Sequence, residues 1–177
     1  THNRLLFFTN RGRVFRLDAF EVPEGKRQAK GTAIVNLLQL QPGEKVSAMV
    51  QMREFENDKY LIMATRNGTV KKTSISAYTN IRKSGIQAIT LREGDELIDV
   101  TISDHSNNIM LVTKNGQGIK FRESDVRETG RSAMGVRGIE LKGNDEVISM
   151  QLDTEGEYIL IVSANGMGKR TPFTEFK

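Results

Sequence analysis

A positively charged side chain recurs at a fixed distance from a glycine at four places in the chain. The glycines are Gly12, Gly68, Gly116 and Gly166. The fourth residue after each glycine is basic in every case, giving Arg16, Lys72, Lys120 and Arg170. Ammonium and guanidinium groups at repeated positions can neutralise a row of phosphates. We therefore predict these four residues as the first choice for phosphate contacts.

Other basic residues near the same glycines, or in the polar stretches that follow, are candidates for the same chemistry. The further candidates are Arg13, Lys71, Lys169, Lys26, Arg27, Lys30, Arg82, Lys83, Arg131 and Arg137. A single lysine pair is usually only a solvated surface, but recurrence in four of four places favours a shared role. Acidic residues gather at other turns, such as residues 93–99, so we expect the acidic turns to lie away from a basic rim.

The residue types exclude most other chemistry. The 177 residues contain no cysteine and two histidines, which excludes disulfides, thiolate metal sites and cysteine catalysis, and makes a histidine-based metal centre improbable. The sequence from Gly166 to Thr171 lacks the glycine spacing of a phosphate-binding loop. We expect no catalytic residue, no metal site and no cofactor. An apolar run long enough to span a membrane is also missing, so we expect no membrane partner.

The glycine motifs belong to a longer repeat with three anchors in constant order. The first is an apolar run followed by the glycine, and the second is a glycine-to-leucine segment, found at residues 31–37, 85–91 and 135–141. The third is an acidic turn before another apolar run, at residues 42–46, 94–97 and 144–147. We predict one domain, residues 1–177, whose repeats span about 4–57, 58–106, 107–156 and, in part, 157–177.

These elements must position the basic residues, and all are of strand length. The Asn-Gly pairs at 67–68, 115–116 and 165–166 predict hairpins with type I′ turns, which need positive φ at both central residues. The glycine anchor then predicts a third strand, and the acidic turn joins it to a fourth. The expected fold is all-β, a propeller-like array of four-stranded blades that is incomplete.

A blade array turns repetition in sequence into repetition in space. Basic positions along one rim would fit duplex DNA bent along it, with many phosphate contacts offsetting the cost of bending. The chain has no tryptophan and three tyrosines, and so few aromatic side chains of this kind argue against base stacking on single strands. Backbone contacts without a recognition helix predict little sequence preference.

Several phrases together resemble the C-terminal domain of the DNA gyrase A subunit. They are residues 7–16 (Phe-Phe-Thr-Asn-Arg-Gly-Arg-Val-Phe-Arg), 30–38, 67–73, 135–139 and 166–171 (Gly-Met-Gly-Lys-Arg-Thr). The resemblance covers essentially the whole chain, and the A-type subunit of topoisomerase IV is a close relative. The family's basic box, Gln-Arg-Arg-Gly-Gly-Lys-Gly, has its nearest match at residues 25–31, where Lys26, Arg27, Lys30 and Gly31 agree.

The resemblance implies a β-pinwheel that wraps duplex DNA around a basic perimeter and supports ATP-dependent negative supercoiling. It implies partners in the rest of gyrase A and, through it, the gyrase B subunit, and a cytoplasmic, nucleoid-associated protein. The cleavage tyrosine, the ATPase, the true basic box and the last blades are then expected outside this segment, which would not be an enzyme by itself. The alternatives are a topoisomerase IV A-subunit domain, a propeller used for protein–protein docking and, more weakly, a propeller enzyme.

Overall fold

The computed structural model describes residues 3–53 and 58–176, which form strands joined by turns and short 3-10 helices. The strands of the first half are β1 (Arg4–Thr9), β2 (Arg13–Asp18), β3 (Val46–Met52), β4 (Tyr60–Thr65), β5 (Thr69–Ser74) and β6 (Ile86–Gln87). Those of the second half are β7 (Leu97–Ser103), β8 (Asn108–Thr113), β9 (Gly118–Arg122), β10 (Val136–Arg137), β11 (Val147–Leu152), β12 (Tyr158–Val162) and β13 (Gly168–Pro172). The 3-10 helices are η1 (Ala19–Glu21), η2 (Ile34–Asn36), η3 (Ile75–Tyr78), η4 (Glu123–Asp125) and η5 (Phe173–Glu175).

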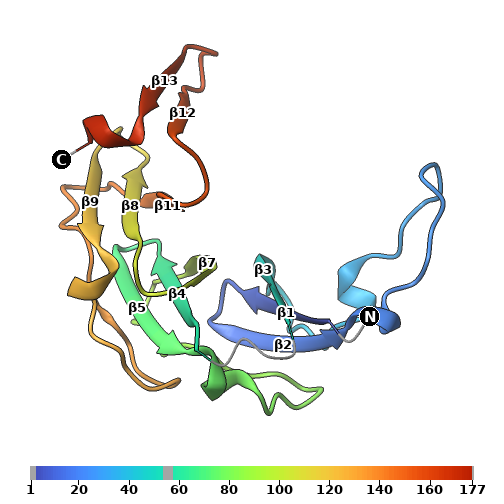
Figure 1. The fold of residues 1–177 in the computed structure, drawn as a ribbon. Helices are drawn as coiled ribbons and strands as arrows, with labels where there is room; N and C mark the ends of the chain where they lie inside the picture. The colour runs from blue at the N-terminus through green and yellow to red at the C-terminus, as the bar shows by residue number, and fades with distance from the viewer. Residues whose placement is uncertain (1–2, 54–57, 177) are drawn as a thin grey trace.

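The strands form four antiparallel sheets, which we call blades 1 to 4. Their strand orders are β3-β1-β2-β6, β10-β5-β4-β7, β11-β8-β9 and β12-β13. The blades follow one another along an arc (Figure 1), with β3, β7 and β11 toward its inner side and β2, β5 and β9 toward its outer side. Strand β7 packs against both β3 and β11, so the inner strands connect successive blades. The all-β blade array predicted from the repeats is confirmed.

The assignment of strands to repeats differs from the prediction. Strand β6 lies in the second repeat but pairs with β2 of the first, and β10 of the third repeat pairs with β5 of the second. Each glycine anchor therefore completes the preceding blade rather than its own. In the first repeat the corresponding segment forms η2 instead of a strand. Exchanged strands of two residues interlock blade 1 with blade 2 and blade 2 with blade 3.

The hairpin turns also differ from the predicted type. In blade 2 the amide of Gly68 donates to the Thr65 carbonyl at 3.1 Å, and Gly68 has a φ of +88°, whereas Asn67 is not in the positive region. A four-residue turn whose last residue is a left-handed glycine is the three-residue hairpin loop with a bulge, not type I′. The same carbonyl bond and positive φ occur at Gly12, Gly116 and Gly166.

The hydrophobic core lies between successive blades. One cluster joins Leu6 and Phe8 of blade 1 to Met63 and Ile75 of blade 2. A second joins Ile62 and Val70 of blade 2 to residues of blade 3, including Ile109, Leu111 and Val147. Since no single blade buries both of its faces, adjacent blades stabilise one another.

Candidate nucleic-acid interface

The end of each blade that carries the glycine turn is built by polar contacts. In blade 2 the Thr65 hydroxyl accepts from the amide of Thr69 at 3.1 Å, and the Asp95 carboxylate accepts from the amide of Asn67 at 3.0 Å. The hydroxyl contact recurs in the other three blades, from Thr9, Thr113 and Ser163. A hydroxyl residue three positions before the glycine is therefore part of the repeat, and the sequence contained this signal.

The acidic turns lie against these glycine turns, which corrects the expectation that they fall elsewhere. Arg66 in the turn of blade 2 is 3.3 Å from Glu96 and 4.0 Å from Glu146. Lys114 in the turn of blade 3 is 3.5 Å from Glu146. Acidic and basic residues are thus partly paired at this end, and it is not a purely basic rim.

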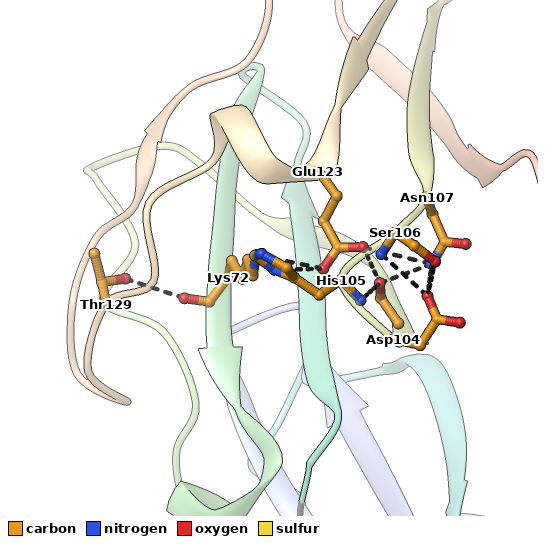
Figure 2. A network of polar contacts seen from close by, with 8 residues as sticks. Lys72, Asp104, His105, Ser106, Asn107, Glu123 and Thr129 are labelled. Carbon is orange, nitrogen blue, oxygen red and sulfur yellow. Dashed lines mark hydrogen bonds and ion pairs between the residues drawn. The ribbon is translucent and has the colours of Figure 1, made fainter.

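The four basic residues at the fourth position after the glycine do not form one exposed row. Lys72 is buried, with only 2% of its surface exposed, and its ammonium group is 3.5 Å from the Glu123 carboxylate in the first turn of blade 3's 3-10 helix. Figure 2 shows Lys72 pointing toward Glu123 and His105, whose Nδ1 it also contacts. A buried ammonium group with these partners is not placed to reach a phosphate, so Lys72 leaves the candidate set.

The other three members of this row differ in exposure. Lys120 is half-buried and donates to the carbonyl of Phe173, the equivalent of Glu123 in blade 4, at 3.3 Å. Arg170 is exposed and stacks 4.5 Å from the centre of the Tyr158 ring. Arg16 is half-buried and lines a hollow of about 200 Å³ together with Lys83 and Ile81 of the next repeat. For Lys72 and Lys120, this position therefore faces the following blade, whereas Arg16 lies in a hollow lined mostly by residues of its own repeat.

The second group of candidates, Arg13, Lys71 and Lys169, is also divided. Arg13 forms an ion pair of 3.0 Å with Glu44 and lies over the Phe15 ring. Lys71 is fully buried and donates to the Ala88 carbonyl at 2.6 Å and to the Arg131 carbonyl. Burial lowers the pKa of Lys71 to about 8, with a smaller contribution from the charge of Arg131. Lys71 therefore leaves the candidate set with Lys72, whereas Lys169 is exposed.

The remaining candidates lie in or beside the segments that link each second strand to the next glycine anchor. We call residues 19–33, 75–85 and 123–135 the connectors. Lys26, Arg27 and Lys30 are exposed in the first, and Arg82 and Lys83 are exposed in the second. In the third, Arg131 is half-buried and donates to the Gln87 carbonyl, while Arg137 just beyond it is exposed and 4.0 Å from Glu140. Figure 1 shows the second and third connectors on the outer side of the arc.

Two exposed arginines were missed, Arg122 at the end of β9 and Arg127 in the third connector. Their position at the end of the second strand or in the segment after it, where Arg82 and Lys83 lie in the second repeat, is the signal that would have found them. Many of the exposed basic residues thus lie in the connectors, while Arg122, Lys169 and Arg170 are exposed on strands.

The described residues also bear on two other kinds of site. Within residues 3–53 and 58–176, no group of three histidine or carboxylate residues could hold a metal ion. None of the helices in this part of the chain is long and apolar enough to cross a membrane.

Comparison with known proteins places this architecture in a family. The family described as "DNA gyrase C-terminal domain, beta-propeller" matches residues 3–51, 59–104, 107–152 and 157–177. The chain belongs to this family. The matched segments cover most of the chain, and the resemblance stated from the sequence is confirmed.

The relatives of this gyrase C-terminal domain family member are much longer than the chain. It is 49% identical to the DNA gyrase A subunit of Clostridium acetobutylicum and 44% identical to that of Halalkalibacterium halodurans, over 76% and 75% of its length. These matches span 16% of either relative.

Two solved structures show the same fold across 99% of the chain. A C-terminal domain of DNA topoisomerase IV has a TM-score of 0.90 at 34% identity, with 55% of that chain covered. A DNA gyrase A C-terminal domain has a TM-score of 0.80 at 27% identity, with 56% covered.

Proposed function

We propose that this chain is a DNA-binding and DNA-wrapping domain of a type II topoisomerase, in the gyrase A subunit. It bends duplex DNA along the outer side of the blade arc and so supports ATP-dependent negative supercoiling. The observation that carries the proposal is the recurrence of exposed arginines and lysines in the connectors of successive blades. Membership of the gyrase C-terminal domain family supports it independently.

The physical basis is neutralisation of phosphates at regular intervals along a curved surface. Each contact releases condensed counterions, and the sum of many contacts offsets the free energy of bending the duplex. The two-residue exchanged strands hold the second and third connectors against the preceding blade, which fixes the spacing of their basic residues. Since the contacts go to the backbone, binding is largely independent of sequence.

In this proposal the domain bends and positions the duplex, and the rest of the enzyme carries out the catalytic steps. Strand cleavage and ATP hydrolysis belong to the remainder of gyrase A and to the gyrase B subunit, which are its protein partners. The setting is the bacterial cytoplasm, at the nucleoid.

A binding experiment tests the connector surface directly. We expect Arg82→Glu combined with Lys83→Glu to weaken binding of a duplex in a gel-shift titration. The matched control is Arg92→Glu with Lys142→Glu, which reverses two exposed charges at the acidic turns. Equal affinity of the connector variant and the wild-type chain would overturn the assignment of these residues.

A topology assay tests wrapping. A gyrase A protein in which this chain replaces the equivalent blades is assembled with the B subunit, ATP and relaxed plasmid, beside a gyrase A protein that lacks the domain. We expect negative supercoils only with the domain present. Relaxation without supercoiling would favour the second candidate, a topoisomerase IV domain, which the TM-score of 0.90 to that structure supports.

A further inference from the structure

Lys72 is the most buried of the four basic residues that follow a repeat glycine by four positions, and it contacts charged and aromatic partners. Its ammonium group lies 3.5 Å from Glu123 Oε1, contacts His105 Nδ1 and lies 4.6 Å from the centre of the Tyr60 ring. Its backbone carbonyl accepts from the amide of Thr129 at 2.9 Å. Tyr60 belongs to strand β4 of blade 2. Figure 2 shows the others: His105 in the turn between blades 2 and 3, and Glu123 and Thr129 in the connector of the third repeat.

Glu123 is an exception within its own repeated position. The seventh residue after the glycine begins the 3-10 helix and is Ala19, Ile75 and Phe173 in the other repeats. Ile75 belongs to the apolar core between blades 1 and 2, and Phe173 belongs to an apolar cluster with Met110 and Val112 of blade 3. At the junction of blades 2 and 3 the same position is a carboxylate with 0% exposure.

The surroundings of Glu123 are arranged for a charged group. Its Oε2 accepts from the Ser103 hydroxyl and from the Asn107 amide at 3.4 Å, which leaves Oε1 toward Lys72. Asn107 also donates to Ser103 at 2.8 Å and to Asp104 at 3.2 Å. The carboxylate is therefore held by residues 103 and 107 on one side and by a lysine of the preceding blade on the other.

A buried ion pair contributes little net stability, because desolvation of both charges offsets their attraction. Glu123 Oε1 is buried and accepts no hydrogen bond from the described residues, and the Lys72 ammonium group at 3.5 Å is its ion-pair partner, so an arrangement of the blades that separates the two would leave a buried charge uncompensated. An apolar contact, like that of Ile75, has no such requirement.

We propose that the Lys72–Glu123 pair sets the angle between blades 2 and 3, and through it the curvature of the DNA path. Lys72 is then a positioning residue and not a DNA ligand. The link to DNA rests on the proposed function, because the angle between successive blades sets the curvature of the arc along which the duplex would bend.

The test compares Lys72→Met, Lys72→Met with Glu123→Met, and the exposed control Lys83→Met. The chain has no cysteine, so Asn67→Cys and Asn115→Cys give unique labels in the equivalent turns of blades 2 and 3. The distance distribution between two spin labels at these sites is measured in the free protein. This distance measurement does not depend on DNA binding. Salt-dependent affinity and end-to-end energy transfer of a bound, doubly labelled duplex are measured in parallel.

We expect Lys72→Met to lower the melting temperature, because it leaves the buried charge of Glu123 without the ammonium group of Lys72, and the double variant to recover it. Both should broaden or shift the label distances and lower the energy transfer of bound DNA, with the salt slope of binding unchanged. Lys83→Met should keep the wild-type distances and reduce the magnitude of the salt slope by about 0.9.

Two outcomes would overturn the inference. A double variant with wild-type label distances and wild-type DNA bending would show that the pair does not set the angle. A loss of about 0.9 in the salt slope of the double variant would show that Lys72 contacts a phosphate after all. Failure of the wild-type chain to bind duplex at low salt would instead count against the proposed function, while the label distances would still decide whether the pair sets the angle.

Discussion

Val136 of the third repeat pairs with Val70 of the second, and this pair of residues marks the exchange of a strand between blades. The equivalent pair one blade earlier joins Ile86 to Val14. Each exchanged strand begins directly after a glycine with positive φ, Gly135 at +90° and Gly85 at +77°. The glycine lets the backbone turn sharply onto the neighbouring sheet, so the integrity of the blade array depends on it.

The first prediction concerns this glycine. A Cβ at Gly135 would lie 2.6 Å from the Val70 carbonyl oxygen, and the positive φ is strained for any other residue. We expect Gly135→Ala to lower the free energy of unfolding by about 3 kcal/mol or more in chemical denaturation. The matched control is Gly31→Ala, at the same place in the first repeat, where a Cβ would meet nothing within 4 Å. Equal stability of the two variants would contradict the exchange.

The second prediction concerns the hydroxyl of the glycine turn. Thr65 is buried, and its hydroxyl accepts from the amide of Thr69. Thr65→Val keeps the shape but removes the acceptor, so we expect a loss of about 1–2 kcal/mol in the free energy of unfolding. Thr32→Val in the exposed first connector serves as the control and should change little. A stability change no larger than that of the control would argue against a role for this bond.

The blades could be predicted from sequence because their hairpins are local. A run such as residues 60–65, a turn with Gly68 and a second run contain all of the information that the hairpin needs. The sheet that a two-residue strand joins cannot be predicted from such local information, because residues 136 and 137 could pair with either neighbouring sheet. Only the packing of whole blades, including the close approach of Gly135 to Val70, decides between them.

The candidate site was harder to predict, for a related reason. A basic residue that recurs four positions after a glycine has the same signature whether it faces solvent or the next blade. Lys72 faces the next blade, and the decisive residue is Glu123, 51 positions later in the chain. The change at that position from apolar residues in three repeats to an acid in one was visible in the sequence, but only the structure shows that it meets Lys72.

The third prediction concerns pH between 4 and 7. Burial raises the pKa of Asp99 on β7 to about 6, and the nearby Glu155 adds to the shift, while a hydrogen bond from the Val100 amide opposes it. The folded state therefore binds a proton more tightly than the unfolded state, and this group's contribution to stability falls as pH rises from about 4 to 7, by about 2 kcal/mol.

Asp99→Asn keeps an oxygen that can accept from the Val100 amide but removes the titration. We expect the variant to be more stable than the wild-type chain at pH 7 and close to it at pH 4, as measured by thermal unfolding across this range. Asp125→Asn, an exposed carboxylate in the third connector, is the control. A constant difference between Asp99→Asn and wild type at every pH would refute the assignment.

The fourth prediction concerns Lys71, whose ammonium group is buried beneath the exchanged strand against two carbonyl groups. Burial lowers its pKa from an ordinary value of 10.5 to about 8, so folding releases a proton from it in the range between these values. Stability should therefore rise from pH 8 to pH 10, by about 2 kcal/mol from this group alone. Burial raises the pKa of Tyr78, so the unfolded state loses this tyrosine proton first and stability falls from about pH 10 upward.

Lys71→Met should remove this rise, whereas the exposed control Lys83→Met should retain it, in denaturant titrations at pH 8, 9 and 10. The comparison of slopes is the decisive quantity, because Lys71→Met also loses the bonds to Ala88 and Arg131, which shifts stability at every pH. Equal slopes for Lys71→Met and wild type would mean that this lysine does not titrate in the folded protein in that range. It would then be a fully charged group, and its place under the exchanged strand would need more compensation than two carbonyl oxygens supply.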